Sequence, residues 1–234
     1  MRDTIKSEEH FSKFIEEEEE IIETILDIMN ERKRLAGDND KGVQNGLIML
    51  ATNYKSYLIA LYSAGDTVEN IKTKFEIAVQ VAEQIWDEDN SYVDLLWFIS
   101  LGVLLDINDK TVENLKSMII KHKLNDRLID YLMNSLDRSW ALSGTYFMKE
   151  PYLFWESVLE NDKKDEIIPK ISDYLINKWY DAHKEMSWYN AHKNSNYFGY
   201  WSFEAGAIVK ILGLDDSCLK SVMYYPYDLV HYKK

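Results

Sequence analysis

Residues 92–105 have the sequence YVDLLWFISLGVLL, the most hydrophobic stretch of the chain. The stretch is too short to cross a bilayer, because a membrane-spanning helix needs about 20 consecutive apolar residues. Ser91 is suited to begin a helix, and Asp106 lies where that helix would end. Because its side chains are apolar almost all round, we expect this helix to lie buried at the centre of the fold, with other helices packed around it.

The rest of the chain has the composition of a helical protein. Nine glycines and three prolines in 234 residues leave long stretches with few helix breakers, and 46% of the residues are hydrophobic, which argues against disorder. We therefore expect an all-α fold, a multi-helix bundle of antiparallel helix pairs with no significant sheet. The other predicted helices span residues 7–36, 43–64, 67–86, 110–121, 126–136, 139–148, 152–159, 165–184 and 197–212.

Local signals predict several helix ends. Ser7 is expected to cap the first helix, Gly65 to end the second in the left-handed conformation, and Thr67 to begin the third. Pro151 suits the first turn of a helix, and Pro169 suits the opening turn of another helix or the position before it. Residues 187–197 are expected to form an irregular loop. The buried stripe of the first helix is predicted to consist of Phe11, Phe14, Ile15, Ile22, Ile25, Leu26 and Met29.

Charge is distributed unevenly along the chain. Residues 1–106 carry 22 acidic and 10 basic side chains, whereas residues 107–234 carry 18 and 17. This asymmetry and a change to shorter helices predict an acidic N-terminal helical domain, residues 1–107, and a C-terminal helical domain, residues 108–234. Because nucleic-acid binding depends on Lys and Arg, direct binding of nucleic acid is not expected, whereas a basic protein partner is. The alternative is that the acidity serves solubility.

Five consecutive glutamates, residues 16–20, occupy the first predicted helix. Glu18 is expected to face the apolar stripe, and the other four are expected to project sideways or outward. One interpretation is a solvated helix face. The other is a negative surface for a basic partner, with candidate residues Glu16, Glu17, Glu19, Glu20, Glu23, Asp87, Glu88 and Asp89.

Glu204 is the candidate for a buried carboxylate. It shares a helical stripe with Trp201 and several aliphatic residues, so we expect it to face inward. A buried carboxylate needs hydrogen-bond donors or a positive partner, for which tyrosines, tryptophans, His183 or His192 are available. A polar network that fixes the fold is one interpretation; catalysis would require a second group, which no spacing identifies.

Asp215 and Asp216 follow the same predicted helix. Capping of a short helix by Asp216 or Ser217 explains them, and an acidic edge that faces a partner is the alternative. The D-x-D-x-D-G pattern of a calcium site is absent, so no metal is expected here.

The segment after this acidic pair, YYPYDL at residues 224–229, is an aromatic turn in which Pro226 fixes φ. Its expected role is to dock the C-terminus onto the helices, which makes Tyr225 and Pro226 structural. Tyr227 and Asp228 are candidate contact residues, since tyrosine is frequent at interaction hot spots.

Three segments occur in order along the C-terminal sequence: GYWSFEA at 199–205, GLDD at 213–216 and YYPYDL at 224–229. Together they resemble the C-terminal part of the PoNi-type immunity proteins, the partners of PoNe-type DNase toxins in bacterial competition. The N-terminal part fits the same family through Arg2-Asp3 and through YSAG at 62–65. The resemblance implies a protein that binds a cognate DNase toxin and blocks it, and it marks Glu204 as part of a scaffold.

Two other functions remain open. A helical adaptor that binds a non-nuclease basic partner would have the same composition, and a cryptic hydrolase would use Glu204 with nearby histidines. Nucleotide-binding, serine-hydrolase and zinc-protease motifs are all absent, so we expect neither an enzyme nor a cofactor. Cys218 is the single cysteine and no apolar signal core follows Met1, so a cytoplasmic protein without a membrane segment is expected. The oligomeric state is not predicted.

Overall fold

The computed structural model describes residues 1–148 and 150–233 and confirms an all-α fold, with no strand among these residues. The chain forms two compact units. The first contains Met1–Trp86 and Asn190–Tyr200, and the second contains Asp87–Tyr189 and Trp201–Lys234. The domain division predicted near residue 107 stays a prediction. No helix among the described residues is long and apolar enough to cross a membrane.

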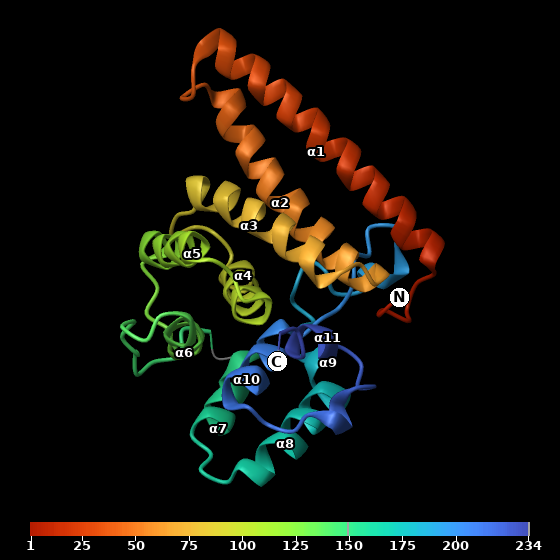
Figure 1. Cartoon of the computed structure of the whole chain (residues 1–234), viewed down its shortest axis with the longest axis vertical. Helices are drawn as coiled ribbons and strands as arrows, with labels where there is room; N and C mark the ends of the chain where they lie inside the picture. Colours follow the sequence, from red (N-terminus) through yellow and green to blue (C-terminus); the bar gives the residue numbers. More distant parts are fainter. Residues whose placement is uncertain (149, 234) are drawn as a thin grey trace. The chain divides into compact units, whose positions relative to one another are not determined.

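The first unit is built on α1 (Glu8–Ala36), α2 (Lys41–Ala64) and α3 (Val68–Ile85). Helices α1 and α2 lie side by side and run in opposite directions (Figure 1). The predicted caps of these helices are confirmed. The side chain of Ser7 accepts a hydrogen bond from the backbone N–H of His10, and Thr67 accepts one from that of Asn70. Gly65 ends α2 with φ +98°, in the left-handed conformation.

The contact between α1 and α2 follows the apolar stripe of α1. Phe11, Phe14, Ile22, Ile25 and Met29 are buried, as predicted. A Cβ placed on Gly46 of α2 would collide with the side chain of Met29, so glycine at this position lets Met29 pack directly against the backbone of α2. The stripe is narrower than predicted: Leu26 is 37% exposed and Ile15 is half-buried, because both lie at its edge.

Residues 190–200, which include η2 (Ala191–Lys193), form the remaining part of the first unit. The hydroxyl of Tyr197 donates to Oδ2 of Asp3 over 2.5 Å. The carbonyl of Tyr197 accepts from Nε2 of His10, and that of Phe198 accepts from the hydroxyl of Ser63. The helix predicted at residues 197–212 therefore begins later, at Phe203, because the carbonyls of Tyr197 and Phe198 bond to side chains far away in the sequence. The irregular character predicted for residues 187–197 is confirmed.

The second unit surrounds the hydrophobic helix α4 (Tyr92–Leu105), in which every residue except Asp94 is buried. It packs against α5 (Asp109–His122), α6 (Arg127–Leu136), α10 (Phe203–Leu212) and α11 (Tyr227–Val230), which confirms its expected central place within this unit. The ammonium of Lys210 in α10 donates to the carbonyl of Leu104, at the end of α4, over 2.6 Å. The remaining elements are η1 (Tyr152–Trp155), α7 (Glu156–Leu159), α8 (Lys164–Asn177), α9 (Trp179–Ala182) and η3 (Ser217–Leu219).

Two further helix predictions are corrected in this unit. Residues 139–148 form a loop instead of a helix, because buried carboxylates bind its backbone: Asp130 accepts from the N–H of Ser143, and Asp126 accepts from that of Phe147. The helix predicted at 165–184 ends at Asn177, where Lys178 leaves the helical conformation, and α9 follows. Pro169 lies inside α8 and not in its first turn.

Candidate functional site

Ten acidic residues and one basic residue, Lys13, occur between Glu8 and Glu31 of α1. The five predicted candidates on this helix, Glu16, Glu17, Glu19, Glu20 and Glu23, are all exposed. Two of them have partners within the first unit. The hydroxyl of Tyr57 donates to Oε1 of Glu19 over 2.5 Å, and Nζ of Lys13 lies 3.6 Å from Oε1 of Glu17.

Glu18 lies on the buried face of α1, as predicted, and is 9% exposed. Burial raises the pKa of its carboxyl to about 7, and the negative charge of Glu17 adds to this effect, while a hydrogen bond with Ser56 opposes it. Its Oε2 is buried without a hydrogen-bond partner. A proton on Glu18 at neutral pH therefore relieves part of the cost of burying this carboxylate.

The acidic loop Asp87–Asp89 belongs to the second unit, whereas the glutamates of α1 belong to the first. The carboxylate of Glu88 forms an ion pair with Lys123 over 2.7 Å. The carbonyl of Asp87 accepts from Nδ1 of His122, and its carboxylate accepts from the N–H of Asp89. The side chains of Asp87, Glu88 and Asp89 are exposed, and their loop is held by contacts with His122 and Lys123 of the same unit.

Glu204 lies in α10 and is 1% exposed, which confirms that it faces inward. Its Oε1 accepts from Nε1 of Trp179 over 3.2 Å and from the hydroxyl of Ser202 over 2.7 Å. Burial raises the pKa of Glu204, although both hydrogen bonds oppose this. The tryptophan was among the predicted donors. Ser202 was missed, although its place two residues before Glu204 could have indicated it.

The two histidines near Glu204 in the sequence have other roles. His183 is 2% exposed and its Nδ1 donates to the carbonyl of Trp179 over 2.6 Å. Burial lowers the pKa of its ring to about 4, so His183 is neutral at physiological pH. His192 belongs to the first unit, where its Nδ1 lies 3.0 Å from the hydroxyl of Tyr200. Glu204 is thus a buried polar group held by neutral donors, and the described residues contain no cluster of three or more potential metal ligands.

Asp216 does not form part of an acidic surface. It is 1% exposed and accepts hydrogen bonds from the hydroxyl of Tyr225 over 2.7 Å and from Nε2 of His231 over 2.9 Å. Its role is therefore to bind the C-terminal segment, and it does not cap η3 with its side chain. Asp215 is exposed and accepts from the N–H of Ser217.

The aromatic turn at residues 224–229 packs on α10. The carbonyl of Tyr224 accepts from the N–H of Ser202 over 2.8 Å. A Cβ on Gly206 would lie 2.6 Å from Cγ of Pro226, so the turn touches the backbone of the helix. Trp201, Tyr225 and Pro226 are buried, while Tyr227 is half-buried and Asp228 is exposed. Within the turn, Asp228 is thus accessible to a partner, and Tyr224 and Tyr227 are partly accessible.

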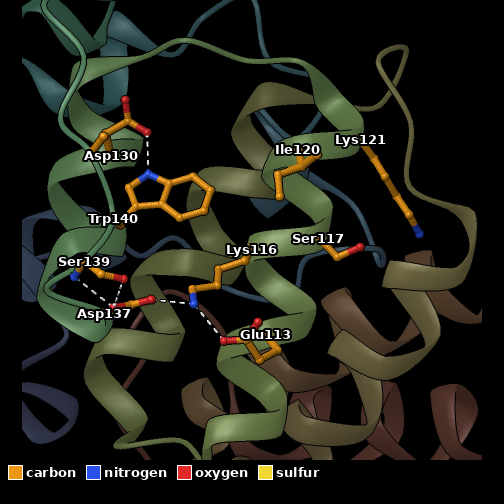
Figure 2. Close-up of a pocket in the computed structure, with 10 residues that line it drawn as sticks. Glu113, Lys116, Ser117, Ile120, Lys121, Asp130, Asp137, Ser139 and Trp140 are labelled. Carbon is orange, nitrogen blue, oxygen red and sulfur yellow. Dashed lines mark hydrogen bonds and ion pairs between the residues drawn. The ribbon is translucent and has the colours of Figure 1, made fainter.

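A pocket of about 650 Å³ in the second unit was not anticipated from the sequence (Figure 2). Side chains of α5 form one wall and the loop after α6 forms the other. Lys116 bonds to Asp137 and Glu113, and these bonds raise its pKa. Nε1 of Trp140 in this loop donates to Asp130 of α6 over 2.8 Å, which holds the indole against the helix. These charges are paired within the pocket, so it offers apolar surface from Ile120 and Trp140 and no evident catalytic group.

Two family models match the chain, one after the other. The model of the N-terminal part of the PoNe immunity proteins (PoNi) matches residues 2–117, and that of the C-terminal part matches residues 124–229. Among solved structures, the crystal structure of protein PA2201 from Pseudomonas aeruginosa is similar, with a TM-score of 0.69 and 17% sequence identity over 92% of this chain and 87% of that chain. At this identity the likeness shows a shared fold alone. No curated protein matches the chain.

Proposed function

This chain belongs to the PoNi family of immunity proteins, and on that premise we propose that it binds a cognate PoNe-type DNase toxin and neutralises it by stoichiometric inhibition. The observation that carries the proposal is the match of both family models, which together extend from residue 2 to residue 229. The resemblance noted in GYWSFEA, GLDD and YYPYDL points to the same family.

The charge of the chain supports the proposed mode of inhibition. A DNase attracts the phosphates of DNA with basic groups. An inhibitor with an excess of 12 acidic side chains in its first 106 residues is attracted to the same surface and excludes the substrate from it. The protein itself is then expected to have no affinity for DNA.

Inhibition by binding requires no chemistry from the inhibitor. The candidate for catalysis, Glu204, is 1% exposed and bonded to Trp179 and Ser202, which favours a structural role. We therefore propose that the protein is not an enzyme and that it acts in the cytoplasm, where an incoming DNase would reach the chromosome.

The candidate toxin contacts follow from exposure. Those on α1 rank first because they lie in the densest acidic sequence of the chain, and Asp87, Glu88 and Asp89 rank second. Asp215, Tyr227 and Asp228 form a third set in the second unit. Buried Asp216 is assigned to the scaffold.

Co-expression with the adjacent open reading frame tests the proposed function. That frame is expected to be toxic alone, with degraded chromosomal DNA, and harmless together with this protein. A matched control is an unrelated acidic protein of similar size and net charge, which should not protect. Toxicity that persists at full expression of this protein would refute the proposal, and protection by the control would show that charge alone is responsible.

A further inference from the structure

Three exposed aliphatic residues lie on one line along α1. Ile21 is 41% exposed, Ile28 is 56% exposed and Leu35 is 66% exposed. Residues seven positions apart in an α-helix differ by about 20° in direction, so these side chains form a row. At 1.5 Å per residue the row is about 21 Å long. Single exposed apolar residues are common on proteins, but an aligned row on one helix indicates a contact surface.

The row is distinct from the face of α1 that packs on α2. The packed face consists of residues such as Ile22, Ile25 and Met29, which are 5–6% exposed. Around the helix axis, Ile21 and Ile28 lie about 100° from Ile22 and Met29 and about 40° and 60° from Ile25, so the row borders the packed face without belonging to it. The packing of the first unit therefore leaves this apolar row uncovered.

An acidic row runs beside the apolar one. Its members, Glu17, Glu20, Asp27 and Glu31, are exposed and continue along the helix at spacings of three, seven and four residues. Glu17 and Glu31 are each four residues before a member of the apolar row, so they are its direct neighbours. A partner that covers the apolar row must therefore also face these carboxylates.

The charge of α1 selects among possible occupants. A second copy of this chain would place the carboxylates of Glu8–Glu31 against their like. The three basic residues at the end of α1 do not outweigh these carboxylates, because Arg32 pairs with Asp40, Lys33 pairs with Asp38 and Arg34 adds a single charge. A surface that combines apolar side chains with Lys or Arg is complementary to both rows.

We propose that the row Ile21, Ile28 and Leu35 is the docking surface for the toxin, which contacts it with apolar side chains bordered by basic ones. This inference rests on the proposed function and adds to it the surface that binds the toxin and the separate effects of the two rows on the binding kinetics. The acidic row accelerates encounter, whereas desolvation of the apolar row slows dissociation.

The test compares the binding kinetics of purified toxin with the wild-type protein and with a variant carrying Ile21→Ser, Ile28→Ser and Leu35→Ser. We expect dissociation at least tenfold faster, with association changed by less than about threefold, since interface truncations act mainly on the dissociation rate. The matched control carries Ile77→Ser and Ile176→Ser, which are 42% and 61% exposed and lie on α3 and α8. Its kinetics should equal those of the wild type.

A photo-crosslinking amino acid at position 28 gives a second readout that does not depend on the triple variant folding. It should crosslink to the toxin, and the same amino acid at position 77 should not. This inference alone would be refuted if the wild-type protein binds the toxin, the triple variant dissociates from it at the wild-type rate, and position 28 gives no crosslink. Failure of the wild-type protein to bind the toxin would refute the proposed function as well. A change from dimer to monomer in the free triple variant would identify the row as a self-association surface and overturn the inference.

Discussion

Glu18→Gln should stabilise the protein at pH 8 and have little effect at pH 4.5. Glu18 is 9% exposed between α1 and α2, and burial raises the pKa of its carboxyl from 4.5 to about 7. Between these values the native state retains a proton that the unfolded chain has released. The protonated Glu18 therefore contributes to the free energy of unfolding at low pH, and this contribution is lost as the pH rises from 4.5 through about 7. Glutamine has a similar shape but never becomes charged, so the variant escapes this loss.

The magnitude follows from the pKa difference. One pKa unit corresponds to about 1.36 kcal/mol, so a change from 4.5 to about 7 sets an upper limit of about 3.4 kcal/mol. Glu18 is 9% exposed, so solvent screening of its carboxylate reduces this value. We expect a gain of about 1–2 kcal/mol at pH 8, or a melting temperature higher by about 2–8 °C in a chain of this size.

Urea denaturation of both proteins from pH 4.5 to pH 8 measures the effect. The control is Glu23→Gln on the exposed side of α1, whose difference from the wild type should be small and independent of pH. A Glu18→Gln difference that is constant with pH, or a variant less stable than the wild type at pH 8, would contradict the proposed protonation of Glu18.

Three further predictions concern the buried polar groups and the acidic helix. Glu204→Ala and Tyr225→Ala should each lower the free energy of unfolding by about 1–3 kcal/mol, because each strands a buried partner, as thermal melts would show; unchanged melts with lost toxin binding would instead make them contact residues. His183 should cost stability as the pH falls from 6.5 to about 4, since the unfolded chain takes up a proton that the buried ring does not; this pH dependence should weaken in His183→Gln, and equal slopes for the two proteins would exclude the effect. Toxin association should slow by about tenfold or more as salt rises from low to physiological concentration. Changing Glu16, Glu17, Glu20 and Glu23 to Lys should slow it likewise, and Glu19 is left out because it bonds to Tyr57. A rate that does not depend on salt would mean that the acidity serves solubility, and a loss confined to an Asp215 and Asp228 variant would move the contact to the second unit.

The helices that sequence reasoning placed correctly are those fixed by local signals. Ser7, Thr67 and Ser91 each precede a regular apolar pattern, and each caps its helix with its own side chain. The buried helix at residues 92–105 was predictable because its apolar character leaves no solvated face. Such signals lie within a few residues of the structure that they determine.

The errors arose where partners are distant in the sequence. Residues 197–200 do not form a helix because His10 and Ser63 bind their carbonyls, and no pattern near residue 197 announces this. The loop at 139–148 is likewise held by Asp126, which caps α6, and by Asp130 within α6.

For the candidate site, the sequence predicted the exposure of the acidic residues on α1 and the burial of Glu18 and Glu204. Asp216 looked like half of an exposed acidic pair, but Tyr225 and His231 enclose it. The row of Ile21, Ile28 and Leu35 is detectable as a seven-residue repeat, yet the stronger stripe of buried residues beside it conceals the repeat.

Titration of a fixed amount of purified toxin with this protein, with the rate of DNA cleavage as the readout, tests the central claim most directly. We predict that activity falls linearly and reaches zero near one equivalent of inhibitor, because neutralisation occurs by formation of a tight complex. Unchanged cleavage at a several-fold excess would contradict the claim. So would complete loss of activity at a small fraction of an equivalent, since that would indicate that the protein destroys or modifies the toxin catalytically.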